Sequence, residues 1–170
     1  MIRKLALAAV AAGLLATPAL AADKLKVEIS KGCSFEITLR PDLAPKHVDQ
    51  ITQLAKDGFY NGIIFHRVID GFMAQTGDPT GTGMGGSKLP DIKAEFTQEP
   101  FKRGTVGMAR SSNPDSGNSQ FFIMFAPGDF LNGQYTVWGQ VDENGMACVD
   151  QIARGEPPAN PDKMVKVTVE

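Results

Sequence analysis

Residues 65–78 read FHRVIDGFMAQTGD and bring a cation, several large apolar side chains and an amide donor into one short stretch. Side chains alternate between the two faces of a strand, which places Arg67 on one face with Phe65 and Ile69. His66 and Val68 then lie on the other face. An arginine beside two apolar neighbours is unexpected in a plain core strand, because burying an unpaired charge is costly. Taken alone, Arg67 is better explained as a side chain that reaches into water from the rim of a barrel.

Residues 117–124 read GNSQFFIM and form the second informative stretch. Adjacent residues of a strand point to opposite faces, so one of Phe121 and Phe122 can fill the core while the other lines a surface pocket. The commoner arrangement of such a pair has both rings packed, one of them beneath a loop. The stretch alone leaves both arrangements open.

Outward from these stretches, turn residues separate short patterned runs. Residues 25–29 and 35–39 alternate apolar and polar side chains and are predicted to be half-buried strands joined at Lys31-Gly32. A helix is predicted to begin at Pro45, whose missing N–H does no harm in a first turn, and to end at Gly58.

The rest of the chain predicts further short strands and one more helix. The predicted strands are residues 63–68, 105–108, 120–125, 136–141 and 164–169, and the predicted helix is 146–153. Many short strands separated by turns indicate an antiparallel sandwich or barrel. Two helices are too few to cover a parallel sheet. Pattern reasoning leaves sandwich and barrel open.

Taken together, the two stretches and several shorter motifs resemble the cyclophilin family. The matching motifs occur in the family's order, and they are FHR 65–67, GFMAQ 71–75, GD 77–78, MA 108–109, SQFFI 119–123, LNG 131–133 and VWG 137–139. The resemblance spans the whole chain after its first residues. It implies a mainly β fold, a closed eight-stranded antiparallel β-barrel capped by two α-helices, and peptidyl-prolyl cis/trans isomerase activity.

That activity rotates X-Pro peptide bonds in other polypeptides. The barrier to rotation is about 18–20 kcal/mol, because the nitrogen lone pair is shared with the carbonyl. In the twisted transition state the prolyl nitrogen becomes pyramidal and keeps its lone pair, so a cation aimed at it binds that state better than either planar isomer. Arg67 matches the residue with this role in the family and stays charged at working pH. The resemblance implies no cofactor and no metal ion.

The resemblance also implies which residues bind the substrate. Some match the pocket for the proline ring, some the strand edge along which the peptide lies, and Gln75 matches the group that orients the arginine. These residues are His66, Phe72, Met73, Gln75, Ala109, Arg110, Gln120, Phe122, Phe130, Leu131 and Tyr135. His66 lines the site and is not interpreted as a general base, because the reaction moves no proton.

Three of these positions depart from the pattern of many relatives. Arg110 stands where many have Asn, and Tyr135 stands where many have His. Phe130 replaces a tryptophan that helps to bind cyclosporin in most eukaryotic relatives. Because a phenyl ring lacks the indole N–H donor, weak inhibition by cyclosporin is expected.

The first residues have the layout of a secretory signal peptide. Arg3-Lys4 precedes an apolar run over residues 5–16, and small residues lead to Ala21. The run is shorter than the roughly 20 residues that span a bilayer. We expect a signal peptide at residues 1–21 and an isomerase domain at residues 22–170 of an exported protein, most simply a periplasmic one, with secretion from the cell as the alternative. An uncleaved anchor helix is the alternative, which the processing pattern disfavours.

Charge argues against nucleic-acid and membrane partners. Loss of Arg3 and Lys4 reduces the 17 basic residues to 15, against 19 acidic residues, for a formal charge of −4. Bulk charge of this sign attracts neither nucleic acid nor an anionic membrane. After signal cleavage we expect no nucleic-acid partner, no membrane partner and a monomer that binds proline-containing polypeptides.

The two cysteines, Cys33 and Cys148, and the two histidines offer few ligands of the kind that fill a structural metal site, which usually takes about four. In an oxidising compartment the cysteines can form a disulfide; two buried thiols are the alternative. In the barrel that the resemblance implies, Cys33 opens the second strand and Cys148 lies on a helix that follows another strand. If those strands are neighbours, both cysteines lie at the same end of the barrel.

Other functions fit only parts of the sequence. Residues 81–88, GTGMGGSK, lack the Gly-Lys-Ser/Thr order of a phosphate-binding loop and are predicted to be a surface loop. A hydrolase is disfavoured because neither histidine has an evident nucleophile and carboxylate to act with. A chaperone module that grips proline segments with little turnover is the main alternative, disfavoured because the chain retains Arg67, Phe72, Gln75 and Phe122.

Overall fold

The computed structural model describes residues 24–170 of the chain. The expected signal peptide, residues 1–21, lies outside the described residues. Within the described part, no helix has both the length and the apolar character needed to cross a membrane.

The described chain folds into eight strands and two α-helices, and every strand pair is antiparallel. The strands are β1 Lys24–Ile29, β2 Ser34–Leu39, β3 Arg67–Ile69, β4 Met73–Thr76, β5 Thr105–Met108, β6 Phe121–Met124, β7 Val137–Gln140 and β8 Met164–Val169. The helices are α1 Pro45–Lys56 and α2 Glu143–Val149, with a short 3₁₀ turn at Asp129–Leu131. A mainly β fold of eight antiparallel strands with two helices is therefore confirmed.

The strands form one curled sheet in the order β3-β4-β6-β5-β7-β2-β1-β8. Within residues 24–170, no continuous ladder joins the edge strands β3 and β8, so the expected closed barrel is wrong and the sheet is an open half-barrel. Single bridges, such as Ile64 to Lys163, span the gap. The segment before β8 contains Pro157, Pro158 and Pro161, which lack the N–H that a ladder needs.

Buried apolar side chains form two clusters on the two faces of the sheet. The larger one fills the interior between the sheet and the helices. The smaller one, called here the site-side cluster, lies beneath the surface on which Arg67 stands. Its buried members are Met73, Phe101, Phe122, Met124, Leu131 and Val137.

The predicted faces of residues 65–69 are partly wrong. Phe65 is buried in the interior cluster with Val68, whereas Ile69 packs against the site-side cluster and Arg67 points outward. The reason is that the regular strand begins only at Arg67, so the alternation of faces does not extend back to Phe65. Arg67 therefore needs no ion-pair partner inside the core.

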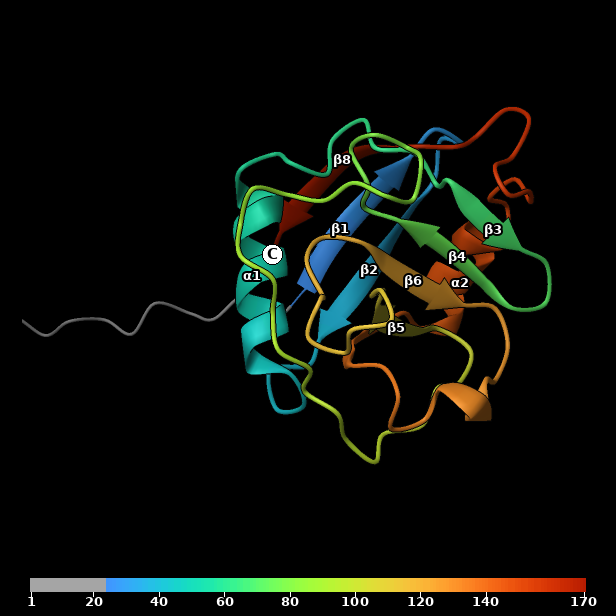
Figure 1. Cartoon of the computed structure of the whole chain (residues 1–170). Coiled ribbons are helices and arrows are strands. Elements are labelled where there is room, and N and C mark those ends of the chain that lie inside the picture. Colours follow the sequence, from blue (N-terminus) through green and yellow to red (C-terminus); the bar gives the residue numbers. More distant parts are fainter. Residues whose placement is uncertain (1–23) are drawn as a thin grey trace, which may run out of the picture.

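Capping residues explain where the helices begin and end. At the end of α1, Gly58 has a φ of 72° and the N–H of Phe59 donates to Leu54 O at 3.0 Å, as in a Schellman motif. The α2 helix begins at Glu143, three residues before the predicted start at 146, because the Asp142 carboxylate accepts a hydrogen bond from the Gly145 N–H at 2.8 Å. The α1 helix packs against β8, beside which it lies in Figure 1. It also contacts β7, and α2 packs against β2.

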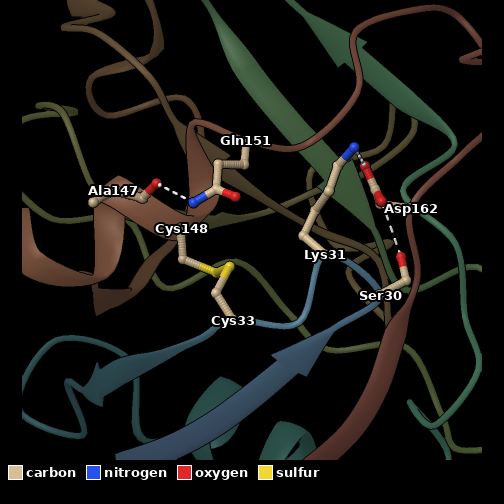
Figure 2. The surroundings of a disulfide bond; sticks show 7 residues. All are labelled: Ser30, Lys31, Cys33, Ala147, Cys148, Gln151 and Asp162. Carbon is tan, nitrogen blue, oxygen red and sulfur yellow. Dashed lines mark hydrogen bonds and ion pairs between the residues drawn. A yellow bond between two sulfur atoms is a disulfide. The ribbon is translucent and has the colours of Figure 1, made fainter.

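A disulfide joins Cys33, which immediately precedes β2, to Cys148 on α2 (Figure 2). The two Cα atoms are 5.9 Å apart, within the range that a disulfide requires. They meet because β2 pairs with β7 and α2 follows β7. Nearby, Asp162 accepts a hydrogen bond from the Ser30 hydroxyl and lies 3.5 Å from the Lys31 ammonium (Figure 2). The turn between β1 and β2 is thus attached to two distant parts of the chain.

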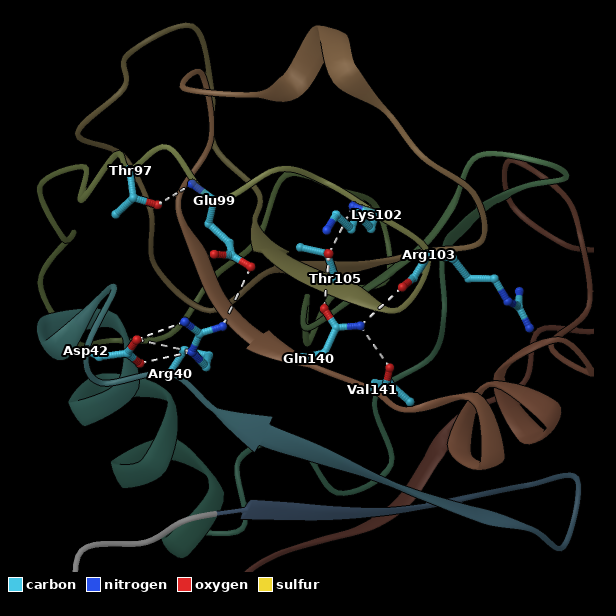
Figure 3. Close-up of polar contacts among 9 residues, drawn as sticks. All are labelled: Arg40, Asp42, Thr97, Glu99, Lys102, Arg103, Thr105, Gln140 and Val141. Atoms are coloured by element: carbon cyan, nitrogen blue, oxygen red, sulfur yellow. Dashed lines mark hydrogen bonds and ion pairs between the residues drawn. The ribbon is translucent and has the colours of Figure 1, made fainter.

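A polar network anchors the loop that carries Phe101 (Figure 3). The Gln140 amide accepts a hydrogen bond from the Thr105 hydroxyl at 3.1 Å and donates to Arg103 O, also at 3.1 Å. At the other side of the loop, Arg40 pairs with Glu99 at 3.7 Å. Phe101 is fully buried between these anchors, with its ring stacked 5.7 Å from the ring of Phe122. The network therefore supports the floor of the site-side cluster.

Candidate active site

Strand register brings three of the expected site residues into one row. Arg67 on β3 lies opposite Gln75 on β4, and Gln75 lies opposite Phe122 on β6. Residues opposite each other in antiparallel strands point to the same face of the sheet. A cation, an amide and an aromatic ring therefore stand side by side on one surface.

A small pocket of about 120 Å³ opens beside this row and is called here the ring pocket. Met73, Phe122 and Leu131 are buried and belong to the site-side cluster. The full lining is Arg67, Phe72, Met73, Gln75, Ala109, Arg110, Phe122, Leu131 and Tyr135. Among the lining residues, Arg67 and Arg110 alone carry charge. Apolar side chains line one part of this recess and polar groups the rest, so a small apolar ring can pack there with hydrogen-bonding groups beside it.

The ring pocket adjoins a wider hollow of about 500 Å³, called here the side hollow. The two share Gln75, Ala109 and Arg110. Residues 83–87, Ser116 and residues 118–120 form much of the remaining wall of the side hollow. If a ring of a bound peptide occupies the ring pocket, the side hollow therefore has room for the side chain of a neighbouring peptide residue.

The guanidinium of Arg67 is held by two partners. Its Nε donates to Oε1 of Glu156 at 3.0 Å, and its Nη1 lies 3.4 Å from Oε1 of Gln75. The Gln75 amide nitrogen in turn donates to Oε1 of Gln120 at 3.0 Å. That bond keeps the Gln75 oxygen turned toward Arg67. The arrangement directs a cation and contains no nucleophile paired with a base.

Arg110 and Tyr135 build the opposite edge of the ring pocket. The Arg110 Nε and Nη2 donate to Gln134 O at 3.0 and 2.8 Å, and its Nη1 donates to Ser111 O at 3.0 Å. The guanidinium lies 4.5 Å from the centre of the Tyr135 ring, a cation–π geometry. The Tyr135 ring meets Phe122 edge to face at 5.7 Å. Arg110 thus joins two loops at the rim of the pocket.

Three of the expected site residues lie outside the ring pocket. Gln120 lines the side hollow, where its amide nitrogen donates to Gly83 O and Gly85 O. Phe130 stands at the rim, 71% exposed, with its ring 5.5 Å from Phe72. His66 is buried and lines neither recess, and burial is the main cause that lowers the pKa of its imidazole.

The exposed Phe130 ring permits a direct test of the expected weak cyclosporin inhibition. Phe130→Trp should strengthen inhibition about five- to tenfold, because the indole N–H adds a hydrogen-bond donor worth about 1 kcal/mol at the rim. Titrating the isomerase activity of both proteins with the drug measures the change. Equal inhibition constants would show that another contact controls binding.

The glycine-rich loop of residues 81–88 is organised by Asp78. The buried Asp78 carboxylate accepts hydrogen bonds from the hydroxyl and N–H of Thr80 and from the N–H groups of Thr82, Gly83 and Gly85. Burial raises the pKa of Asp78, but the hydrogen bonds outweigh it and hold the pKa at about 2. The same loop presents the carbonyls that Gln120 contacts.

Acid should therefore loosen this loop. The pKa of Asp78 is about 2 in the folded chain against an ordinary value of 3.8. Its stabilisation is thus complete above about pH 4 and is lost as the pH falls through 2, by about 2 kcal/mol in total. The free energy of unfolding of the wild type should fall more steeply over this range than that of Asp78→Asn. Denaturant titrations from pH 2 to 7 test this, and parallel curves would contradict it.

Two contributors to the site have no local sequence signal. Phe101, beneath Phe122, lies in an irregular loop. Glu156 reaches Arg67 from a segment 89 residues further along the chain. Only tertiary structure brings these residues to the site.

One surface of the sheet therefore carries Arg67, held by Gln75 and Glu156, beside the ring pocket. The family model for "Cyclophilin type peptidyl-prolyl cis-trans isomerase/CLD" matches residues 24–169. The chain therefore belongs to the cyclophilin-type peptidyl-prolyl cis-trans isomerases.

Similar proteins carry the same activity in their names. A "Probable peptidyl-prolyl cis-trans isomerase" of Brucella suis is 57% identical over 150 residues, covering 79% of this chain and 76% of that protein. A "Peptidyl-prolyl cis-trans isomerase" of Helicobacter pylori is 45% identical over 116 residues, covering 66% and 70%. The family and its enzymatic activity are thus those that the sequence motifs indicate.

Solved structures agree with the fold. The crystal structure of cyclophilin AquaCyp293 from Hirschia baltica matches with a TM-score of 0.78 at 30% identity, covering 86% of this chain and 73% of that one. A cyclophilin-type isomerase from Cryptosporidium parvum, solved in the presence of the dipeptide Ala-Pro, matches with a TM-score of 0.79 at 26% identity. That alignment covers 86% of this chain and 98% of the other.

Proposed function

We propose that this chain accelerates the rotation of X-Pro peptide bonds by stabilising the pyramidal prolyl nitrogen with Arg67 while the ring pocket holds the proline. The observation that carries the proposal is the row formed by Arg67, Gln75 and Phe122 across three strands. It places a directed cation beside an apolar recess. The Ala-Pro dipeptide present with the Cryptosporidium parvum relative supports a proline ligand at such a site.

Each side of the site has a separate task in this mechanism. Met73, Phe122 and Leu131 hold the proline ring by apolar contact, so the acyl part N-terminal to the proline turns relative to it. Gln75 and Glu156 direct the Arg67 guanidinium. Rotation breaks amide resonance, and the lone pair that returns to nitrogen then accepts a hydrogen bond from the cation.

Differential binding is the source of catalysis here. Planar cis and planar trans prolyl nitrogens have little lone-pair density to share with Arg67, whereas the twisted nitrogen has much more. The interaction is thus stronger in the transition state than in either ground state, which lowers the barrier for both directions. His66 takes no part in proton transfer, because no bond to hydrogen is made or broken.

An isomerisation assay tests the proposed function. Residues 22–170 should accelerate the cis-to-trans conversion of a short Ala-Ala-Pro-Phe peptide, followed at 10 °C, where the uncatalysed reaction takes minutes. The matched control is the same amount of folded Arg67→Ala. No acceleration at micromolar enzyme would contradict the proposal.

We also propose that the substrates are exported proteins that fold in the periplasm. The support is the signal-like layout of residues 1–21 together with a disulfide that an oxidising compartment would maintain. Mass spectrometry of the native chain tests the location. A chain that begins near Ala22 is expected, and an intact Met1 in a cytoplasmic fraction would contradict it.

A further inference from the structure

The segment before β8 is docked against β3 directly beside Arg67. Gly155 and Val68 exchange two backbone hydrogen bonds, each of 2.8 Å. Gly155 has a φ of 145°, and a Cβ there would come within 2.5 Å of the Cα of Pro158. Pro158 is itself buried. The turn therefore depends on glycine and is fixed at both sides of Glu156.

This docking brings the Glu156 carboxylate to the Nε edge of Arg67. Oε1 of Glu156 lies 3.0 Å from Nε, and Oε1 of Gln75 lies 3.4 Å from Nη1. Within residues 24–170, Nη2 of Arg67 has no side-chain or carbonyl acceptor. Two of the three guanidinium nitrogens thus have partners among the described residues, and the third, Nη2, is left for a ligand.

The charges around Arg67 leave Glu156 as its acidic partner. Within the described chain, no other carboxylate lies within ion-pair distance of this guanidinium. Asp70, which directly follows β3, pairs with Arg154 instead at 3.1 Å. Asp78 is turned toward the N–H groups of its own loop.

The Arg67–Glu156 pair contributes little to folding. The two side chains are 44% and 56% exposed, and ion pairs with this exposure typically stabilise a protein by less than about 1 kcal/mol. The main effect of the pair is instead on the orientation of the Arg67 guanidinium. An arginine side chain has several rotatable bonds, and a planar guanidinium recognises an acceptor only when its plane is set. Holding that plane before the substrate arrives removes a cost from the catalysed step.

We infer that Glu156 is a positioning residue for the isomerase reaction: with Gln75 it sets the plane of the Arg67 guanidinium and directs Nη2 at the prolyl nitrogen. The inference rests on the proposed function. A carboxylate can act here in two opposite ways. It orients the guanidinium, which favours catalysis, and it offsets part of the positive charge, which opposes it. We take the orienting effect as the larger one, because Glu156 bonds to Nε alone and, within residues 24–170, Nη2 keeps its donors free of side-chain and carbonyl acceptors.

Two substitutions separate the effects. Glu156→Ala removes the acceptor and should lower kcat about fivefold, with KM within about twofold, because the ring pocket still binds the peptide. Glu156→Gln keeps an oxygen acceptor without the charge and should retain at least half of the wild-type kcat. Glu36→Gln is the matched control: Glu36 is similarly exposed and pairs with Lys24 at 2.7 Å on β1 and β2, and its kcat should be unchanged.

A double-mutant cycle shows whether Glu156 acts through Arg67. In an Arg67→Ala background, adding Glu156→Ala should change the residual rate by less than about twofold, since the group to be positioned is gone. The NMR signal of the Arg67 Nε–H gives an independent readout. The signal should be observable in the wild type and in Glu156→Gln, and should broaden through exchange with water in Glu156→Ala.

These results separate failure of the inference from failure of the proposed function. If Arg67→Ala keeps wild-type activity, the proposed mechanism fails, and the inference fails with it. If Arg67→Ala is inactive while Glu156→Ala has wild-type kcat, the inference alone is overturned. A kcat above wild type in Glu156→Ala or Glu156→Gln would also overturn it, as would a Glu156→Ala loss that persists in the Arg67→Ala background.

Discussion

Arg67→Ala should lower kcat/KM about a hundred- to a thousandfold, the typical cost of about 2.7–4 kcal/mol for removing a preorganised donor to a transition state. The free energy of unfolding should change by less than about 1 kcal/mol, because Arg67 is half-exposed and forms an ion pair at the surface. The contrast between a large kinetic effect and a small effect on stability is what distinguishes a catalytic arginine from one that merely supports the rim.

Companion variants sharpen this expectation. Arg67→Lys should recover little activity, because an ammonium on a flexible stem cannot present the planar donors that Gln75 and Glu156 hold. Gln75→Ala should show a milder loss, and His66→Gln should retain much of the activity. The rate should stay nearly flat from about pH 6 to 9, because the proposed reaction transfers no proton. Circular dichroism must show a folded Arg67→Ala; a collapsed fold would instead assign Arg67 a structural role.

Loss of the Cys33–Cys148 disulfide should be the largest single effect on stability. The cysteines are 115 residues apart, and in the chain-entropy model a crosslink that closes a loop of this size stabilises the folded state by about 4–5 kcal/mol. A variant with alanine at both positions should therefore lose about 4 kcal/mol of unfolding free energy. Its activity under native conditions should remain, because neither cysteine lines the ring pocket.

Denaturant titration measures this effect, and reduced wild type is the control. Reduced wild type lacks the crosslink but keeps both cysteine side chains. Comparing it with the double-alanine variant therefore separates loss of the crosslink from loss of packing at the buried position of Cys148. The oxidised wild type should have a higher free energy of unfolding than the reduced wild type and the double-alanine variant. The values for these two forms should differ by less than about 1 kcal/mol. Equal stability of the oxidised and reduced wild type would show that the crosslink adds nothing to the folded state.

Much of the fold was predictable, because alternation and turn residues act locally. The runs 105–108 and 164–169 match β5 and β8, and Pro45 begins α1 as expected. The start of α2 was missed because the apolar spacing of residues 146–153 says nothing about the cap at Asp142. The open gap between β3 and β8 was missed because closure depends on how distant edges meet. A proline-rich segment before β8 prevents that pairing.

The candidate site was also predictable in part from the sequence. Residues 65–75 carry both Arg67 and Gln75, so a local motif is enough to predict that the two side chains lie together; their role in catalysis stays a prediction. The faces of residues 65–69 were assigned wrongly at Phe65, since alternation holds only inside a regular strand. Glu156 cannot be found from the sequence, because it lies 89 residues after Arg67 in the chain and reaches it only through the docking of a turn against β3.

The central claim is that Arg67 acts on the twisted transition state and not on the bound ground states. NMR exchange on an Ala-Pro-containing peptide gives both its Kd and the rate of isomerisation on the enzyme. For folded Arg67→Ala, the Kd should stay within about threefold of the wild type while the on-enzyme rate falls at least about a hundredfold. An unchanged on-enzyme rate, with any loss of activity explained by a weaker Kd, would contradict the claim.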